Sequence, residues 1–293
     1  MNHAPSDAEL AQADQLLTPL RRALNEVLFD QEELIDLTLT ALLARGHVLL
    51  EGLPGLGKTE LVKGLARLLG LDTKRLQFTP DLLPGDITGN PILQESEGHR
   101  RFVFHPGPLF ANLVLADEIN RASPKTQSAL LEAMQEGHVT VLGEAHRLPA
   151  PFLVLDTQNP LELEGTYPLP EAQLDRFLFK LLLQPYQAET LQRIILQRHP
   201  GEDSRLEPVL MPVQLQELFA LTRRIHLPEV VANYIARLIH ATQPGASDCA
   251  ALLSYGAGPR AALSLATAAR ARALLQNRPN ASFEDVQALA HPV

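Results

Sequence analysis

The sequence predicts an α/β fold, in which a parallel sheet with helices on both faces is followed by a small all-α domain. Up to about Gln187, short apolar runs of strand length alternate with segments of helical periodicity. After Pro185 only helical patterns continue. A phosphate-binding sequence lies between the first strand and the next helix. We therefore expect an α/β nucleotide-binding domain with N-terminal helices over residues 1–187 and a helical domain over residues 188–293.

The strands expected in this sheet are short, apolar and bounded by polar or turn-forming residues. They are His47–Leu50, Arg75–Phe78, Leu113–Ala116, Phe152–Asp156 and Phe177–Leu182. The expected helices repeat apolar residues at helical spacing. They are Thr59–Leu69, Glu189–Gln197, Val213–Thr222, Pro228–His240, Arg260–Gln276 and Ser282–Leu289, with a polar loop at Pro200–Pro208. Pro228 suits a first helical turn, and Ser282 suits an N-cap because Asp285 stands three residues later.

The segment Gly52–Thr59 fits the pattern G-x-x-x-x-G-K-[ST]. In this pattern backbone N–H groups surround the β-phosphate of a nucleotide, the lysine reaches the β and γ oxygens, and the hydroxyl ligates Mg²⁺. A glycine-rich turn with a chance Lys-Thr pair is the alternative, but the flanking strand and helix favour the phosphate loop. The expected nucleotide-binding residues are Gly52, Leu53, Pro54, Gly55, Leu56, Gly57, Lys58, Thr59 and Glu60.

Two adjacent carboxylates, Asp117 and Glu118, follow the apolar run Asn112–Ala116. Ligands of open α/β sheets lie beyond the carboxyl ends of the strands. We expect Asp117 to hold Mg²⁺ together with Thr59, and Glu118 to polarise the attacking water. The alternative is a strand that ends in a solvated Asp-Glu pair. Together with the phosphate loop, the acidic pair predicts hydrolysis as well as binding.

Three polar residues further along the chain are candidates for sensing or completing the site. Asn159 ends another apolar run and is placed to hydrogen-bond the γ-phosphate and the water; the alternative is a turn-forming Asn-Pro. Arg176 is a candidate arginine finger for a neighbour's γ-phosphate, unless it merely pairs with Asp175 on the surface. Arg121 either braces a subunit interface or caps the Asp117-Glu118 loop.

Composition limits the possible functions. The net charge is −9, and the first 187 residues carry 15 Lys and Arg against 25 Asp and Glu, so no basic stripe for a nucleic-acid backbone is seen. The single cysteine, Cys249, excludes a disulfide framework and favours a reducing, cytoplasmic location. No signal-like segment or apolar run of membrane-spanning length is seen. The histidines lack metal-ligand spacing.

Taken together, these motifs closely resemble the MoxR family of AAA+ ATPases over roughly Val27 to Leu289. The likeness is carried by GHVLLEGLPGLGKT, TPDLLPGDITG, GPLFANLVLADEINRASPKTQSALLEAMQEGHVTV and TQNPLELEGTYPLPEAQLDRFLFK. It implies Walker A at Gly52–Thr59, Walker B at Asp117 and Glu118, sensor 1 at Asn159, and the finger at Arg176. It also implies that Arg260 is sensor 2, supplied by the helical lid.

The resemblance also identifies two inserts, which in related rings face the central channel. The helix-2 insert holds the β-like runs Pro91–Gln94 and Arg101–Phe104 around a polar turn at Glu95–Arg100. The pre-sensor-1 hairpin turns at Leu142–Ala145. The mixed charge of their tips suits a protein client better than a phosphate backbone, although solvated hairpins without a client contact are the alternative.

Three features depart from the family pattern. Asp30 stands where relatives usually have Gly before the Gln of the N-terminal motif, which affects the adenine side. Asp156 replaces the small residue usual before TQNP. The chain stops at Val293, before the basic segment with which relatives tend to close the lid, so a truncated or differently completed lid is expected.

The function predicted from the sequence is Mg²⁺-dependent ATP hydrolysis in a homo-oligomeric ring, a hexamer, that remodels or matures a protein client or metalloenzyme complex. By resemblance, a partner with a von Willebrand factor A domain is expected. One alternative is the motor subunit of a metal chelatase. Another is a nucleotide-gated scaffold with little turnover, which Glu118, Asn159 and Arg176 argue against. No nucleic-acid partner is expected.

Overall fold

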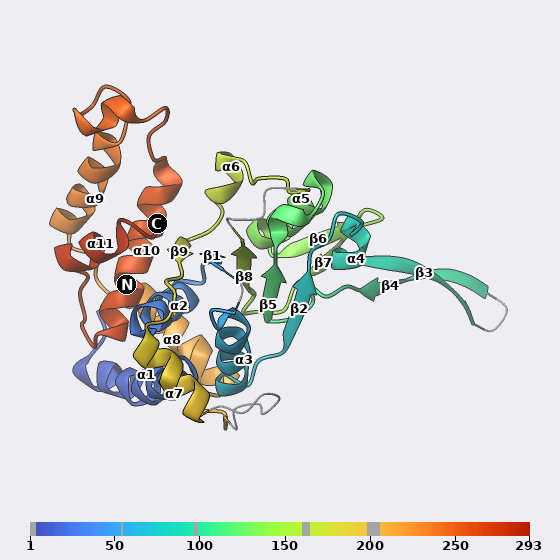
Figure 1. The fold of residues 1–293 in the computed structure, drawn as a ribbon, viewed down its shortest axis with the longest axis horizontal. Coiled ribbons are helices and arrows are strands. Elements are labelled where there is room, and N and C mark those ends of the chain that lie inside the picture. Colours follow the sequence, from blue (N-terminus) through green and yellow to red (C-terminus); the bar gives the residue numbers. More distant parts are fainter. Residues whose placement is uncertain (1–3, 54, 97–98, 160–164, 198–205) are drawn as a thin grey trace.

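The computed structural model describes residues 4–53, 55–96, 99–159, 165–197 and 206–293 (Figure 1). At its centre is a five-stranded sheet in which all neighbours are parallel, in the order β2-β5-β8-β1-β9. Its strands are β1 (Val48–Glu51), β2 (Thr73–Gln77), β5 (Leu113–Asp117), β8 (Leu153–Gln158) and β9 (Phe179–Leu182). All five predicted strands are therefore confirmed, and no strand end differs from its prediction by more than two residues.

Helices cover both faces of the sheet, as predicted. Those before β9 are α1 (Asp7–Val27), α2 (Glu32–Ala44), α3 (Lys58–Leu68), α4 (Pro84–Thr88), the 3-10 turn η1 (Ile119–Arg121), α5 (Pro124–Glu136) and α6 (Glu171–Leu174). Those after it are α7 (Ala188–Gln197), α8 (Pro212–Arg224), α9 (Glu229–Ala241), η2 (Cys249–Leu252), α10 (Pro259–Leu275) and α11 (Phe283–Leu289). The predicted loop at Pro200–Pro208 lies mostly outside the described residues.

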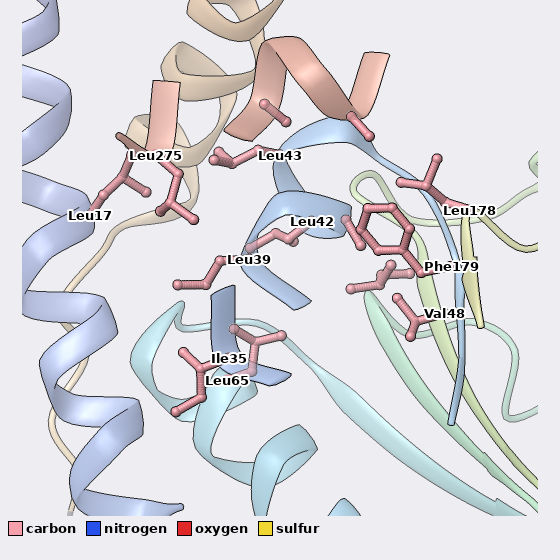
Figure 2. Packing of buried hydrophobic residues seen from close by; sticks show 14 of the residues in the cluster. Leu17, Ile35, Leu39, Leu42, Leu43, Val48, Leu65, Leu178, Phe179 and Leu275 are labelled. Carbon is pink, nitrogen blue, oxygen red and sulfur yellow. The ribbon is translucent and has the colours of Figure 1, made fainter. Parts of the chain in front are cut away.

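Alternation along the strands assigns each face of the sheet to its own hydrophobic cluster. Val48 and Leu50 point to a cluster that contains α1, α2, α3 and the C-terminal helices (Figure 2). Leu49 points to the opposite face, where it belongs to the same buried cluster as Leu130 of α5. The N-terminal helices thus share one core with α8 and α10, and Leu17 of α1 lies near Leu275 of α10.

The N-terminus of α11 is capped as the sequence predicts, whereas that of α9 differs from its prediction. Ser282 caps α11, and its amide and hydroxyl both donate to Asp285, as predicted. Pro228 is the N-cap of α9 rather than part of its first turn, because the helix begins at Glu229. Among the described residues no helix is both long and apolar enough to cross a lipid bilayer.

Two hairpins leave the sheet, and both differ in length from their predictions. The first, β3 (Gly89–Ser96) with β4 (His99–Pro106), projects far from the body (Figure 1). Its strands are longer than predicted because Glu95 and Arg100 pair across them at 3.2 Å instead of forming a turn. The second joins β6 (His138–Val141) to β7 (Glu144–Arg147) through two residues only, Leu142 and Gly143, both with positive φ.

Candidate active site

The phosphate loop connects the end of β1 to the start of α3. Gly55 and Gly57 have φ values of 85° and 82°, which side chains other than glycine adopt only with strain. Gly57 is the N-cap of α3, and a Cβ there would approach the Tyr186 hydroxyl to 2.9 Å. The loop therefore brings the N-terminus of α3 to the carboxyl end of β1, where backbone N–H groups and the helix dipole favour a bound phosphate. Pro54 lies outside the described residues.

Lys58 spans the mouth of this loop. Its Nζ donates to the Gly52 carbonyl at 2.7 Å, across the loop. Burial lowers the pKa of the half-buried ammonium, while the nearby carboxylates of Asp117 and Glu118 act in the opposite direction. The side chain is thus held as a partly desolvated cation, the state in which it attracts an anion most strongly.

Thr157 of β8 joins the two carboxylate residues, a role that the sequence reasoning missed. Its Oγ1 donates to Asp117 Oδ1 at 3.1 Å and accepts the Glu118 backbone N–H at 3.1 Å. Glu118 has left-handed backbone angles, φ 61° and ψ 51°, which end β5 abruptly. Because such angles are strained for a non-glycine residue, the contact to Thr157 fixes the direction in which Glu118 leaves the strand.

Side chains of β2 and η1 complete the surroundings of the acidic pair. Arg75 Nε lies 2.6 Å from Asp117 Oδ2. Gln77 Nε2 donates to Glu118 Oε2 at 2.8 Å, and Arg121 Nε lies 3.3 Å from the same oxygen. Of the two alternatives for Arg121, the contact within its own chain is therefore observed.

These groups converge on one pocket of about 150 Å³. It is lined by Gly52, Gly55, Lys58, Thr59, Arg75, Gln77, Asp117, Glu118, Thr157 and Asn159. The structure thus brings together residues that the sequence places more than 100 positions apart. The hydroxyl oxygen of Thr59 and the carboxylate oxygens of Asp117 are of the kind that Mg²⁺ prefers as ligands. The Asp117 carboxylate also binds a positive charge in this structure, the guanidinium of Arg75. The donor set fits a magnesium nucleotide.

The two arginines predicted to act on nucleotide lie elsewhere. Arg176 and Arg260 line a different pocket, of about 300 Å³, that shares no residue with the first. Arg260 Nη1 pairs with Asp175 Oδ2 at 2.9 Å, so Asp175 is engaged by Arg260, and the predicted alternative of a surface Asp175–Arg176 pair is not what the structure forms. The Arg176 Nε is buried and has no hydrogen-bond partner among the described residues.

The two aspartates that depart from the family pattern, Asp30 and Asp156, differ in their surroundings: Asp30 is hydrogen-bonded to α7, and Asp156 is buried in the sheet. Asp30 has a φ of 51°, a value that glycine adopts freely, and its carboxylate accepts from Thr190 Oγ1 at 2.6 Å and Arg193 Nη1 at 2.7 Å. The hydrogen bond from Thr190 is the main cause that lowers the pKa of Asp30. The aspartate therefore ties the segment before α2 to α7, and both border a cavity of about 540 Å³.

Asp156 lies inside the sheet and is fully buried. Its Oδ1 accepts the Thr157 N–H at 2.8 Å, and within the part of the chain that the structure describes its Oδ2 has no hydrogen-bond partner. Burial raises the pKa of this carboxyl well above its ordinary value, and the neighbouring charge of Asp117 acts in the same direction. Asp156 does not line the nucleotide pocket, whose carboxylates are those of Asp117 and Glu118.

Comparisons with known proteins agree with this geometry. A family model described as "ATPase family associated with various cellular activities (AAA)" matches residues 47–179, and one described as "AAA lid domain" matches residues 245–293. Chaperone MoxR1 of Mycobacterium tuberculosis is 43% identical over 91% of this chain and 72% of its own length. Protein MoxR of Methylorubrum extorquens is 31% identical over 97% of this chain and 88% of its own.

A crystal structure of a candidate ATPase from Cytophaga hutchinsonii has the same fold. It superposes with a TM-score of 0.90 at 37% identity, covering 98% of this chain and 88% of the other.

Proposed function

The chain belongs to the MoxR family of AAA+ ATPases, and from that premise we propose that it hydrolyses Mg²⁺·ATP in a ring-shaped homo-oligomer, a hexamer, to remodel or mature a protein client. One observation supports the hydrolysis above all others. The phosphate loop, Lys58, the acidic pair and Asn159 line a single pocket at the carboxyl end of the parallel sheet.

In this proposal each residue of the pocket has a distinct task. Lys58 leaves the Gly52 carbonyl for the β- and γ-phosphate oxygens. Thr59 and Asp117 would hold a metal ion, which would supply neutralisation of the phosphate charge. Glu118 accepts the proton of the attacking water, in the position that Thr157 fixes. Asn159 orients that water and the γ-phosphate. The base and ribose lie toward the 540 Å³ cavity, because Tyr186 lines it and also contacts the Leu56 carbonyl.

We place Arg176 and Arg260 in the neighbouring subunit's site. Neither lines the nucleotide pocket of its own chain, yet an arginine finger must approach the γ-phosphate to act. Their common position beside Asp175 supports joint action across one subunit interface. A monomer then has an incomplete site, and the ring is the active form.

Two further parts of the proposal concern the client and the domains. The projecting β3–β4 hairpin exposes Ile92, Leu93 and Phe102, which suits contact with a protein client. A relative is named a chaperone, and a partner with a von Willebrand factor A domain is proposed by resemblance. We keep residues 188–293 as the lid, because only helices follow β9 among the described residues, and we propose a cytoplasmic location.

Replacing Glu118 by Gln tests the hydrolysis directly. The amide keeps the shape of the side chain but cannot act as a base, so turnover should fall by about 10²-fold or more while nucleotide affinity is kept. Phosphate release at saturating Mg²⁺·ATP and titration with a fluorescent nucleotide measure the two quantities. Glu132→Gln, an exposed change on α5, is the matched control. Turnover above about a tenth of the wild-type value would remove Glu118 from this role.

A further inference from the structure

Arg75 contributes a second cation to the nucleotide pocket, and none of the motifs above assigns it a role. It lies on β2, the edge strand that pairs in parallel with β5. In the register of these strands Gln77 lies opposite Asp117. Arg75 lies two residues before Gln77 on β2, and its side chain extends along the strand toward the Asp117 carboxylate. Its Nε meets Asp117 Oδ2 at 2.6 Å, and its Nη2 donates to Gln77 Oε1 at 3.2 Å.

The two partners of this ion pair differ in their freedom to move. The Asp117 side chain is 12% exposed and is fixed on its other oxygen by Thr157, whereas the Arg75 side chain is 60% exposed. The carboxylate cannot follow the arginine out of the pocket. The guanidinium, on a long flexible stem at the surface, can leave the carboxylate at small cost.

The Arg75–Asp117 ion pair stabilises a carboxylate that is mostly buried. A carboxylate that is mostly removed from water is unfavourable unless a cation faces it. Arg75 is a cation in direct contact with the Asp117 carboxylate, and that carboxylate is also the proposed metal ligand. Arginine and metal therefore compete for the same carboxylate, since Arg75 is paired with its Oδ2 and two cations at one group repel each other.

We propose that Arg75 is a positioning residue that holds Asp117 until the divalent ion arrives, and that it leaves the carboxylate when the ion binds. The proposal rests on the proposed function of the pocket and adds a consequence. Arg75 supports binding of nucleotide without metal, because it keeps Asp117 neutralised next to the phosphates. It weakens binding of the metal, because the metal must displace it.

Thermodynamic linkage turns this consequence into one measurable ratio. The ratio divides the nucleotide dissociation constant in EDTA by that in excess Mg²⁺. Arg75→Gln removes the charge and keeps a hydrogen-bonding side chain, so metal-free affinity should fall and the ratio should rise. For a part-exposed ion pair the expected rise is about 3- to 5-fold.

The experiment uses the full chain and a fluorescent, non-hydrolysable ATP analogue, so it does not depend on turnover. Arg75→Lys keeps the charge and should keep a ratio closer to the wild type. Arg100→Gln removes an arginine of a solvent-exposed ion pair on the projecting β3–β4 hairpin and should leave the ratio unchanged. As an independent readout, the free Mn²⁺ signal in electron paramagnetic resonance should show tighter Mn²⁺ binding by Arg75→Gln saturated with ADP.

An unchanged ratio in folded Arg75→Gln, checked by circular dichroism, would overturn the proposal, as would equal Mn²⁺ affinities of variant and wild type. Such a result differs from a failure of the proposed function. If the proposed function fails, the wild-type protein releases no phosphate, or Glu118→Gln releases it at an undiminished rate, whatever the metal dependence of nucleotide binding.

Discussion

Thr157→Val removes one hydroxyl and with it both contacts that join the acidic pair to β8. Valine has nearly the same shape and is equally suited to a strand, so packing around this 3% exposed residue is kept. Asp117 loses a donor at 3.1 Å, and the Glu118 N–H loses its acceptor at 3.1 Å. The change therefore tests whether the hydroxyl positions the two carboxylates.

The expected magnitude follows from these two bonds. A hydrogen bond to a charged group contributes about 1.5–3 kcal/mol, and an unsatisfied buried N–H costs about 1–3 kcal/mol. Because Asp117 keeps Arg75 and water can reach the pocket, we expect a combined loss of about 2–4 kcal/mol in the free energy of unfolding. With the left-handed Glu118 no longer anchored, a displacement of its carboxylate by about 1 Å should lower kcat by about 10²-fold.

Phosphate release at saturating Mg²⁺·ATP gives kcat, and urea denaturation gives the stability. Thr157→Ser keeps the hydroxyl and removes only a methyl group, so it should retain most of kcat. A merely structural role predicts that both variants lose stability and keep turnover. The positioning argument is wrong if Thr157→Val, correctly folded, keeps kcat within about 3-fold of Thr157→Ser.

Three further predictions follow. Lys58→Ala should abolish tight ATP binding, because it removes the ammonium that faces the β- and γ-phosphates; unchanged affinity in a fluorescent titration would contradict the assignment. Burial lowers the pKa of His47 to about 4 from 6.5, so the unfolded state takes up the proton first as the pH falls. Stability should thus drop by about 3 kcal/mol between pH 6.5 and 4, a slope that His47→Gln removes in denaturation series. The raised pKa of Asp156 acts in the opposite direction: the folded protein loses stability as the pH rises above the ordinary pKa of an aspartate. The stability of Asp156→Asn relative to wild type should therefore increase with pH, and equal pH slopes of the two proteins would refute this.

The strands and the phosphate loop could be predicted because their signals are local. The loop pattern, the apolar run before it and the leucine spacing after it all lie within some 20 residues of sequence. The β6–β7 turn was predicted too long because Leu142 has a φ of 50°, a conformation that leucine seldom adopts. The β3–β4 strands were predicted too short because charged residues at a hairpin tip look like a turn until their cross-strand pairing is known.

The parts of the site that were missed depend on strand register and domain packing. Arg75 and Gln77 were predicted only as strand residues, and they reach Asp117 and Glu118 because β2 pairs with β5. The contact of Asp175 with Arg260 joins residues 85 positions apart. Asp175 precedes the C-terminal helical segment, and Arg260 lies within it. No local pattern encodes such contacts, which follow from the topology of the sheet and the docking of α10.

A mixing experiment tests most directly the claim that the active site is shared between subunits. Arg176→Ala should bind ATP almost normally and lose hydrolysis by about 10³-fold or more, while Lys58→Ala lacks a working pocket. In an equal mixture, one variant supplies the intact pocket and the other the intact arginine. Random assembly of a closed ring then makes about a quarter of the interfaces complete. The account predicts phosphate release at up to about a quarter of the wild-type rate. A mixture that demonstrably co-assembles, for example by native mass spectrometry, and yet shows no activity above the separate variants would contradict it.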